Sequence, residues 1–298
     1  MAGINNIPFA KVGEFIGGAR EGQRRRRECV RVAVELEDGA PRELALALKG
    51  ALMPETASGL VHVGAIRAGV AVRVNPDADV AVIVAAGPSG PGASVARAFR
   101  RAGVPCVIVV ESSLDAPGGE GLEGTALVSA ASTDALLAKL ASWMADACGR
   151  DIALAANFPF CRRAVAERCV RERSAQNAVV GLVPLGSGAD LPIMAANQAL
   201  MALDVSGAYG RGADAERLGE VAVVLALALS SRSLARRLCA VLPGLGLLIK
   251  AGIAYGGTYC LGEALVLRLE LAERLGHGAA SVENPSRSSS LPLTNAKA

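Results

Sequence analysis

The segment VAVELEDGAPRELALALKG, residues 32–50, has the order of a phosphate-binding motif: a strand pattern, a turn with glycine, then a helix pattern. In a P-loop, GxxxxGK[ST], backbone amides surround the phosphates, the Lys contacts their β and γ oxygens, and the hydroxyl binds magnesium. Here the turn carries Glu37 and Asp38, and Pro41 stands where the Lys is expected. Carboxylates repel a triphosphate and proline removes an amide donor. The segment therefore predicts the shape of a phosphate site without its chemistry.

A second glycine-rich loop, GPSGPGAS at residues 87–94, lies between a buried strand pattern and a helix pattern. Helix N-termini at the carboxyl ends of parallel strands attract anions, so a phosphate-bearing small molecule is one hypothesis for this loop. Its two prolines remove amides and its spacing is not GxGxxG, which favours a structural loop. The candidate ligand-binding residues are Gly87, Ser89, Gly90 and Gly92.

The sequence has few residues that could bind a metal or act in catalysis. His62 and His277 are the two histidines and the seven cysteines form no CxxC pair, so we expect no metal site, no cofactor and no catalytic residue. Cysteines inside apolar runs are typical of reduced, buried thiols in a protein that faces the cytosol. Arginine far outnumbers lysine among the 31 basic residues, which indicates codon bias more than a nucleic-acid surface, and we expect no nucleic acid partner.

The elements that would position these loops alternate between strand and helix. We predict a doubly wound α/β domain over residues 29–150 with a mainly parallel sheet. The continuous apolar run DVAVIVAA, residues 79–86, is typical of a strand buried on both faces. Strands are also predicted at 30–37, 105–110 and 126–129, extended segments at 60–74, and helices at 41–53, 93–102 and 133–148.

Four stretches in this domain resemble G domains in their order and spacing. The helix at 41–53 has the L-x-x-A-L-x-G pattern of the first helix in small GTPases, and ADVAVIVAAG resembles the strand that follows their second switch. SSLD at 112–115 stands in place of the guanine-reading NKxD motif. ALVSAAS resembles the short strand and turn that support the base. The resemblance implies a pseudo-GTPase, because the P-loop Lys and Ser, the DxxG motif and the Asn and Lys of NKxD are not retained. Asp115 and Ser129 are its candidate base-pocket residues, and turn chemistry is the preferred alternative for both.

Residues 151–276 are predicted to form an apolar helical domain. An Arg-rich helix is expected at 160–174, and two final helices are expected after a Pro243-Gly244 turn, to about Leu275. The segments VGLVPLGSGADLPIMAANQALM, LPGLG at 242–246 and TYCLGEA at 258–264 are similar to the hydrophobic helical domain of the YcjF family, over about 176–270. That resemblance implies a membrane-linked accessory role, without catalytic residues. We therefore expect a protein partner or self-association through this domain, with inner-membrane association as a further expectation.

Direct signs of a membrane are mixed. A spanning helix needs about 20 apolar residues, and the uncharged runs here are shorter. Gly252 and Gly256 have a small-xxx-small spacing that lets helices approach closely in a membrane or in a soluble bundle. Arg232, Arg236 and Arg237 precede an apolar hairpin, where they would contact anionic head groups or form a solvated helix face. We expect the protein at the cytoplasmic face of the membrane, or alternatively in the cytoplasm.

Both ends of the chain look separate from these domains. Residues 1–28 combine an amphipathic segment with a run of four arginines, which favours a helix docked on the body over one lying on a membrane. Residues 277–298 are rich in Ser, Asn and Pro and are predicted to be a disordered tail. The sequence as a whole predicts a non-catalytic, G-domain-like protein with an associating helical domain; the alternative is a soluble sensor or enzyme that binds a phosphate-bearing molecule at 87–94.

Overall fold

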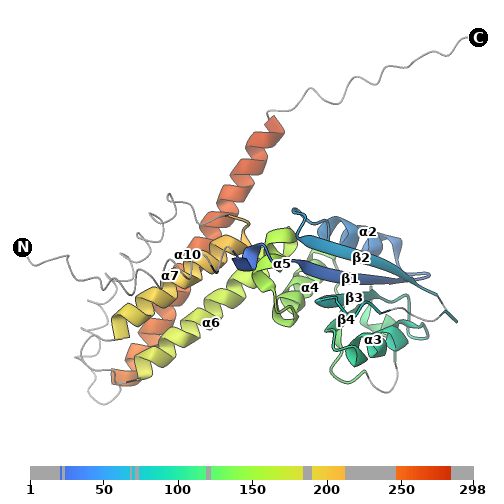
Figure 1. The fold of residues 1–298 in the computed structure, drawn as a ribbon, viewed down its shortest axis with the longest axis horizontal. Coiled ribbons are helices and arrows are strands. Elements are labelled where there is room, and N and C mark those ends of the chain that lie inside the picture. Colours follow the sequence, from blue (N-terminus) through green and yellow to red (C-terminus); the bar gives the residue numbers. More distant parts are fainter. Residues whose placement is uncertain are drawn as a thin grey trace, which may run out of the picture.

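The computed structural model describes residues 21, 24–67, 69–70, 74–118, 122–183, 190–211 and 246–282. These residues form a sheet covered by helices and an elongated group of long helices beside it (Figure 1). The two parts follow one another along the chain, and they meet near residue 151. The described elements after residue 151 are all helices.

The sheet contains five strands in the order β2-β1-β3-β4-β5, and every pairing is parallel. That order is one of the two common doubly wound arrangements. The chain runs from β1 outward to β2, then returns to β3 on the other side of β1, so the winding direction reverses between β1 and β3. The strands are β1 (Val30–Glu37), β2 (Gly59–Ile66), β3 (Val80–Val84), β4 (Cys106–Val109) and β5 (Ala126–Val128).

Helices cover both faces of this sheet. The helix α2 (Arg42–Ala51) and the helix α4 (Thr133–Ala147) pack on one face, and α3 (Gly92–Arg101) packs on the other. Because side chains alternate along a strand, Val32 and Val34 of β1 face α2 while Ala33 faces the α3 side. These elements confirm the predicted strands and helices of this half. The described residues of the region predicted as extended segments at 60–74 contain one strand, β2.

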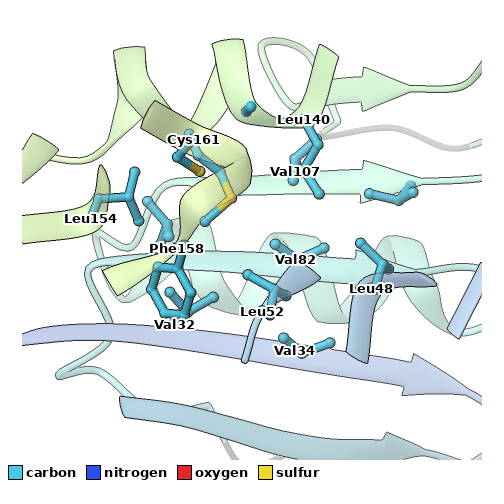
Figure 2. Packing of buried hydrophobic residues seen from close by; sticks show 14 of the residues in the cluster. Val32, Val34, Leu48, Leu52, Val82, Val107, Leu140, Leu154, Phe158 and Cys161 are labelled. Carbon is cyan, nitrogen blue, oxygen red and sulfur yellow. The ribbon is translucent and has the colours of Figure 1, made fainter. Parts of the chain in front are cut away.

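The core on the α2 and α4 face consists of branched aliphatic side chains that meet at sheet and helix surfaces. Figure 2 shows Leu48 and Leu52 beside Val34 and Val82, with Phe158 close to Val32. Phe158 follows α5 (Asp151–Asn157), so the first short helix of the second half contributes to the core of the first. The two halves therefore share a hydrophobic core at their junction.

The described residues of the second half form three long helices: α6 (Arg162–Leu182), α7 (Asp190–Ala208) and α10 (Gly246–Val282). A short 3-10 helix η2 (Pro159–Cys161) leads into α6. Two glycines allow α6 and α10 to pack closely: a Cβ at Gly181 would lie 3.1 Å from the Ala251 Cα, and one at Gly262 would lie 2.5 Å from the Val170 side chain. Among the described helices, none combines the length and apolarity needed to cross a membrane.

The helical half differs from the sequence prediction in two places. The helix α6 extends to Leu182, beyond the Arg-rich helix expected at 160–174. The helix α10 is one continuous helix where two were expected, and it continues to Val282, past the boundary at which a disordered tail was predicted to begin. Its glycines do not end it, because packing against α6 along much of its length outweighs their lower helix propensity.

Candidate functional site

A hollow of about 470 Å³ lies at the carboxyl edge of the sheet, where β1 and β3 end. This is the point at which the winding direction reverses, and doubly wound folds bind ligands in the crevice at such a point. Its volume is within the range of small-molecule sites. The hollow is lined by Glu37 at the end of β1 and Asp38 after it, by Ile66 at the end of β2, and by the glycine-rich loop 86–91 after β3.

The Glu37 side chain is folded into this loop. It is only 7% exposed, and its Oε2 accepts a hydrogen bond of 3.1 Å from the Ala86 amide. The loop fits closely around the carboxylate: a Cβ at Gly90 would overlap Oε1, and one at Gly92 would lie 3.3 Å from Oε2. Glycine at position 90 is therefore explained by the approach of the Glu37 side chain.

This arrangement decides what charge the loop can accept. Gly92 is the first residue of α3, and no acidic side chain lies in the first turn of that helix. The partial positive charge of a helix N-terminus attracts an anion. Here the nearest anion is the protein's own carboxylate, Glu37, and a bound phosphate at the same place would meet its negative charge.

The opening turn adds a second carboxylate. Asp38 also lines the hollow and lies 3.6 Å from Arg67, in an exposed ion pair. Gly39 adopts φ +91°, a conformation that glycine reaches without strain, so the chain can turn sharply between β1 and α2. Pro41 precedes α2 without a side-chain capping bond. The segment at 32–50 is thus a strand, a turn and a helix as predicted, and its turn presents carboxylates to the hollow.

The remaining candidate residues of the α/β half share the same edge of the sheet but not the same contacts. Gly87, Ser89 and Gly90 line the hollow. Asp115 follows β4 in a short 3-10 helix η1 (Ser113–Asp115), where its Oδ2 accepts the Ser112 amide at 3.3 Å. The Ser112 hydroxyl in turn accepts the Leu114 amide, which completes a capping box. These bonds fit the turn-chemistry interpretation of Asp115.

Ser129 follows β5, and its carbonyl oxygen accepts a 2.8 Å hydrogen bond from Lys139 of α4.

The candidate residues for contact with a membrane or a partner lie in the helical half. Arg232, Arg236 and Arg237 fall outside the described residues. Gly252 and Gly256 are on α10, where a Cβ at either position would meet no described atom within 4 Å. Among the described residues, the close contact between helices uses Gly181 and Gly262 instead.

A buried carboxylate that sequence reasoning missed lies on β1. Glu35 is 4% exposed, and its side chain covers Gly64 of the neighbouring strand, where a Cβ would overlap it. Its Oε1 has no hydrogen-bond partner among the described residues. Burial raises the pKa of the Glu35 carboxyl, and nearby His62 partly offsets this increase. Glu35 and Glu37 alternate on one face of β1, and two acids at this spacing gave no local signal that this face is buried.

A polar network between the long helices was also not predicted. Asn177 donates to the Thr258 hydroxyl at 2.9 Å, and Gln198 donates to the same hydroxyl at 3.1 Å. Asn197 donates to Asn177 Oδ1 at 2.9 Å and accepts from Arg173. Asn177 and Thr258 are fully buried. Hydrogen bonds therefore join α6, α7 and α10 in their interior.

Charged side chains extend this network to the junction of the halves. Arg173 contacts Asp204 at 2.8 Å, and Asp204 also lies 3.3 Å from Arg25, which reaches Asp151 at 2.9 Å. Arg25 of the basic run thus contacts α5 and α7, and the amphipathic segment before this run lies outside the described residues.

At the other side of the junction, buried Arg162 bonds to Glu55 of the α/β half and to Glu273 of α10.

Comparison of the chain with protein-family models, with curated proteins and with solved structures gives no match.

Proposed function

We propose that this protein is a non-hydrolysing relative of G-domain proteins whose helical half associates with another macromolecule. The observation that carries the proposal is the Glu37 carboxylate in the loop at the carboxyl edge of the sheet. In a nucleotide-binding protein that region receives an anion. Here it holds an acidic side chain that already uses the Ala86 amide, and Asp38 adds a further negative group beside it.

The resemblance to G domains supports the same direction. The strand, turn and helix at 30–51 have the expected order, and strands lie before the SSLD segment and before Ser129. Asp115 is engaged in its own turn, which accounts for it without a bound base. A pseudo-GTPase keeps the order of strands and helices of a G domain and lacks the polar residues that bind and hydrolyse the nucleotide.

The helical half supports an associating role. It resembles the YcjF domain, and its three described long helices are held together by buried hydrogen bonds between Asn177, Gln198 and Thr258. We therefore propose association with a protein partner, or with the cytoplasmic face of the inner membrane, through the outside of this bundle.

Titration of the purified chain with fluorescent GTP and ATP analogues in the presence of magnesium tests the first part of the proposal. We expect no saturable binding and no release of inorganic phosphate. Micromolar binding with turnover would overturn the proposal. Fractionation of cells at low and high salt, without detergent, tests the second part: we expect the protein in a membrane fraction or in a larger complex, and recovery only as an isolated monomer would contradict association.

A second candidate function is favoured by the hollow itself. Its size suits a small molecule, so the protein could act as a sensor or enzyme that uses the loop at 87–94. A thermal-shift panel of nucleotides, phosphorylated metabolites and inorganic phosphate tests it. A phosphorylated ligand that raises the melting temperature would support this candidate, and no response to any of them would exclude a phosphate-bearing ligand.

A further inference from the structure

The strand β2 forms one edge of the sheet, and this edge lacks the features that usually protect a sheet from further pairing (Figure 1). Proteins protect such edges with very short strands, charged side chains or prolines. β2 has eight residues, GLVHVGAI, with no Lys, Arg, Asp, Glu or Pro among them, and among the described strands it pairs only with β1. The opposite edge strand, β5, has only three residues. The edge at β2 is therefore the one that can accept another strand.

The hydrogen bonds to β1 show which backbone groups of β2 point toward the open edge. The Val30 amide donates to the Ser58 carbonyl at 2.9 Å, and the Asp38 amide donates to the Ile66 carbonyl at 3.0 Å. Because the direction of these groups alternates along a strand, the even-numbered residues from 58 to 66 bond to β1. The odd-numbered residues direct both their amide and their carbonyl to the open edge; within β2 these include Val61, Val63 and Ala65.

A second copy of β2 fits this edge in an antiparallel arrangement centred on Val63. There the outward-directed residues meet one another: Val63 lies opposite Val63 of the second copy, and Val61 lies opposite Ala65. An antiparallel strand at the edge of an otherwise parallel sheet is common in doubly wound folds. Val63 is 59% exposed, so its side chain is free to pack on its counterpart.

The same arrangement places a hydrogen-bond donor beside the buried Glu35 carboxylate. Glu35 extends from β1 across Gly64 of β2, and its Oε1 has no hydrogen-bond partner among the described residues. With Val63 at the centre, His62 of the second copy lies opposite Gly64, on the face of the sheet that carries Glu35. An imidazole N–H can donate to a carboxylate. The two-fold symmetry repeats this contact, so each copy supplies a donor to the other.

This contact also selects the register. His62 of the same chain lies near Glu35 but leaves Oε1 unbonded. A register centred on His62 would satisfy the outward-directed backbone groups as well, but it would place two imidazoles directly opposite each other in a closely spaced pair. The register centred on Val63 instead places each imidazole opposite a glycine and beside a carboxylate. It is therefore the more favourable of the two.

We propose that two copies of this chain pair edge to edge through β2, residues 59–66, in an antiparallel arrangement in which His62 of each copy contacts Glu35 of the other. The inference concerns the α/β half and goes beyond the proposed association through the helical half. One strand from each side is a small contact, so we expect a dimer that dissociates on dilution.

Sedimentation velocity of the full chain over a range of concentrations tests the pairing. We expect Val63→Lys to raise the Kd of the dimer by about tenfold to a hundredfold, because two ammonium groups then meet where two valines packed. Leu127→Lys is the matched control, since Leu127 is 46% exposed on β5, at the other edge of the same sheet, and it should leave the Kd unchanged. Circular dichroism should be the same for all three proteins.

A double-mutant cycle tests the contact between the two copies. His62→Ala should raise the Kd of the dimer by about tenfold, because a donor to a buried carboxylate is lost. In a Glu35→Ala background the same change should have no further effect, because the acceptor is gone. His62→Gln, which keeps a side-chain donor, should recover part of the loss. Equal effects of His62→Ala with and without Glu35 would contradict the contact.

Hydrogen exchange measured by NMR at low and high protein concentration tests the register. In the dilute monomer the amides of odd-numbered residues from 61 to 65 should exchange rapidly, whereas those of even-numbered residues from 60 to 64 are held by β1. Raising the concentration should slow the odd-numbered set alone. A dimer in which these amides still exchange rapidly would overturn the inference.

The remaining outcomes are equally decisive. A wild type that is monomeric at all concentrations would overturn the inference, and so would a dimer that Val63→Lys leaves unchanged or that Leu127→Lys weakens equally. Slow exchange of the odd-numbered amides in a monomer would also overturn it, because another segment of the same chain would then cover the edge.

Discussion

The two halves of the molecule bury polar groups in opposite places. The sheet of the α/β half is filled with Val, Ile and Ala, and its buried carboxylates, Glu35 and Glu37, lie toward the carboxyl end of β1. In the helical half, Asn177, Thr258 and Gln198 lie between helices, in the interior. The difference follows from how each architecture fixes its register.

Neighbouring strands share backbone hydrogen bonds, and these bonds together with the alternation of side chains set the register of the sheet. Helices satisfy their backbone bonds internally, so only side chains can fix how one helix slides on another. Polar groups in a helical core can supply that specificity, since a misplaced partner leaves a buried donor unpaired. We interpret the Asn177 network as the element that sets the register of α6, α7 and α10.

Removal of a large side chain should have the greatest effect, and it should act in the α/β half. Phe99 of α3 is fully buried against the sheet. We expect Phe99→Ala to reduce the free energy of unfolding by about 3 to 5 kcal/mol, because a cavity replaces the ring. Urea denaturation measures the loss. Hydrogen exchange should rise in β3 and β4 more than in α10, and an equal rise in both would contradict the separation of the Phe99 cluster from the core of the helical bundle.

Loss of one amide should be the next largest effect, and it should act in the helical half. Asn177→Ala leaves the Asn197 amide without one acceptor and removes a donor to Thr258. We expect a loss of about 1 to 3 kcal/mol in unfolding free energy. The control is Val179→Ala, at a position 60% exposed on the same helix. If Asn177→Ala has no larger effect than the control, the network does not set the register.

A pair of glycines in α10 distinguishes close packing from helix propensity. At Gly262 an added methyl group would lie 2.5 Å from buried Val170, whereas at Gly252 it would meet no described atom within 4 Å. We expect Gly262→Ala to destabilise the fold by about 1 to 2 kcal/mol. Gly252→Ala should stabilise it by up to about 1 kcal/mol, because alanine is the better helix former. Thermal unfolding compares the two, and the same sign for both would contradict the packing at Gly262.

The smallest expected effect concerns Glu35 and depends on pH. Burial raises the pKa of this carboxyl in the folded state above its ordinary value of 4.5, so folding favours the protonated form. Its contribution to stability is fully present below that ordinary value and is lost as the pH rises through the folded pKa. Glu35→Gln should therefore gain stability relative to the wild type between about pH 4 and pH 8.

Urea denaturation of both proteins at the two pH values measures this gain. Glu43→Gln, on the exposed face of α2, is the control and should show no such trend. A stability difference between Glu35→Gln and the wild type that is independent of pH would argue against a buried ionisable carboxyl at position 35.

Local patterns in the sequence were sufficient for most elements of the α/β half. The apolar run at 79–86 predicts a buried strand, and Leu44 and Leu48 predict the inner face of α2, because these signals depend on neighbouring residues. The inward position of Glu37 depends on a loop about 50 residues away, and the contact of Asn177 with Thr258 depends on a helix about 80 residues away. Neither has a local signal.

The length of α10 shows the same limit. The sequence predicts two helices in a region where the structure has one, and Gly252, Gly256 and Gly257 lower the helix propensity of that region. Contacts with α6 keep this segment helical, and such contacts cannot be read from one segment alone.

Calorimetric titration with GTP and magnesium, performed on the wild type and on Glu37→Ala, tests the central claim most directly. If Glu37 holds the position of a bound phosphate, the wild type should give no binding heat up to millimolar nucleotide, and removal of the carboxylate should leave any binding equal or stronger. Micromolar binding by the wild type that is lost in Glu37→Ala would contradict the account.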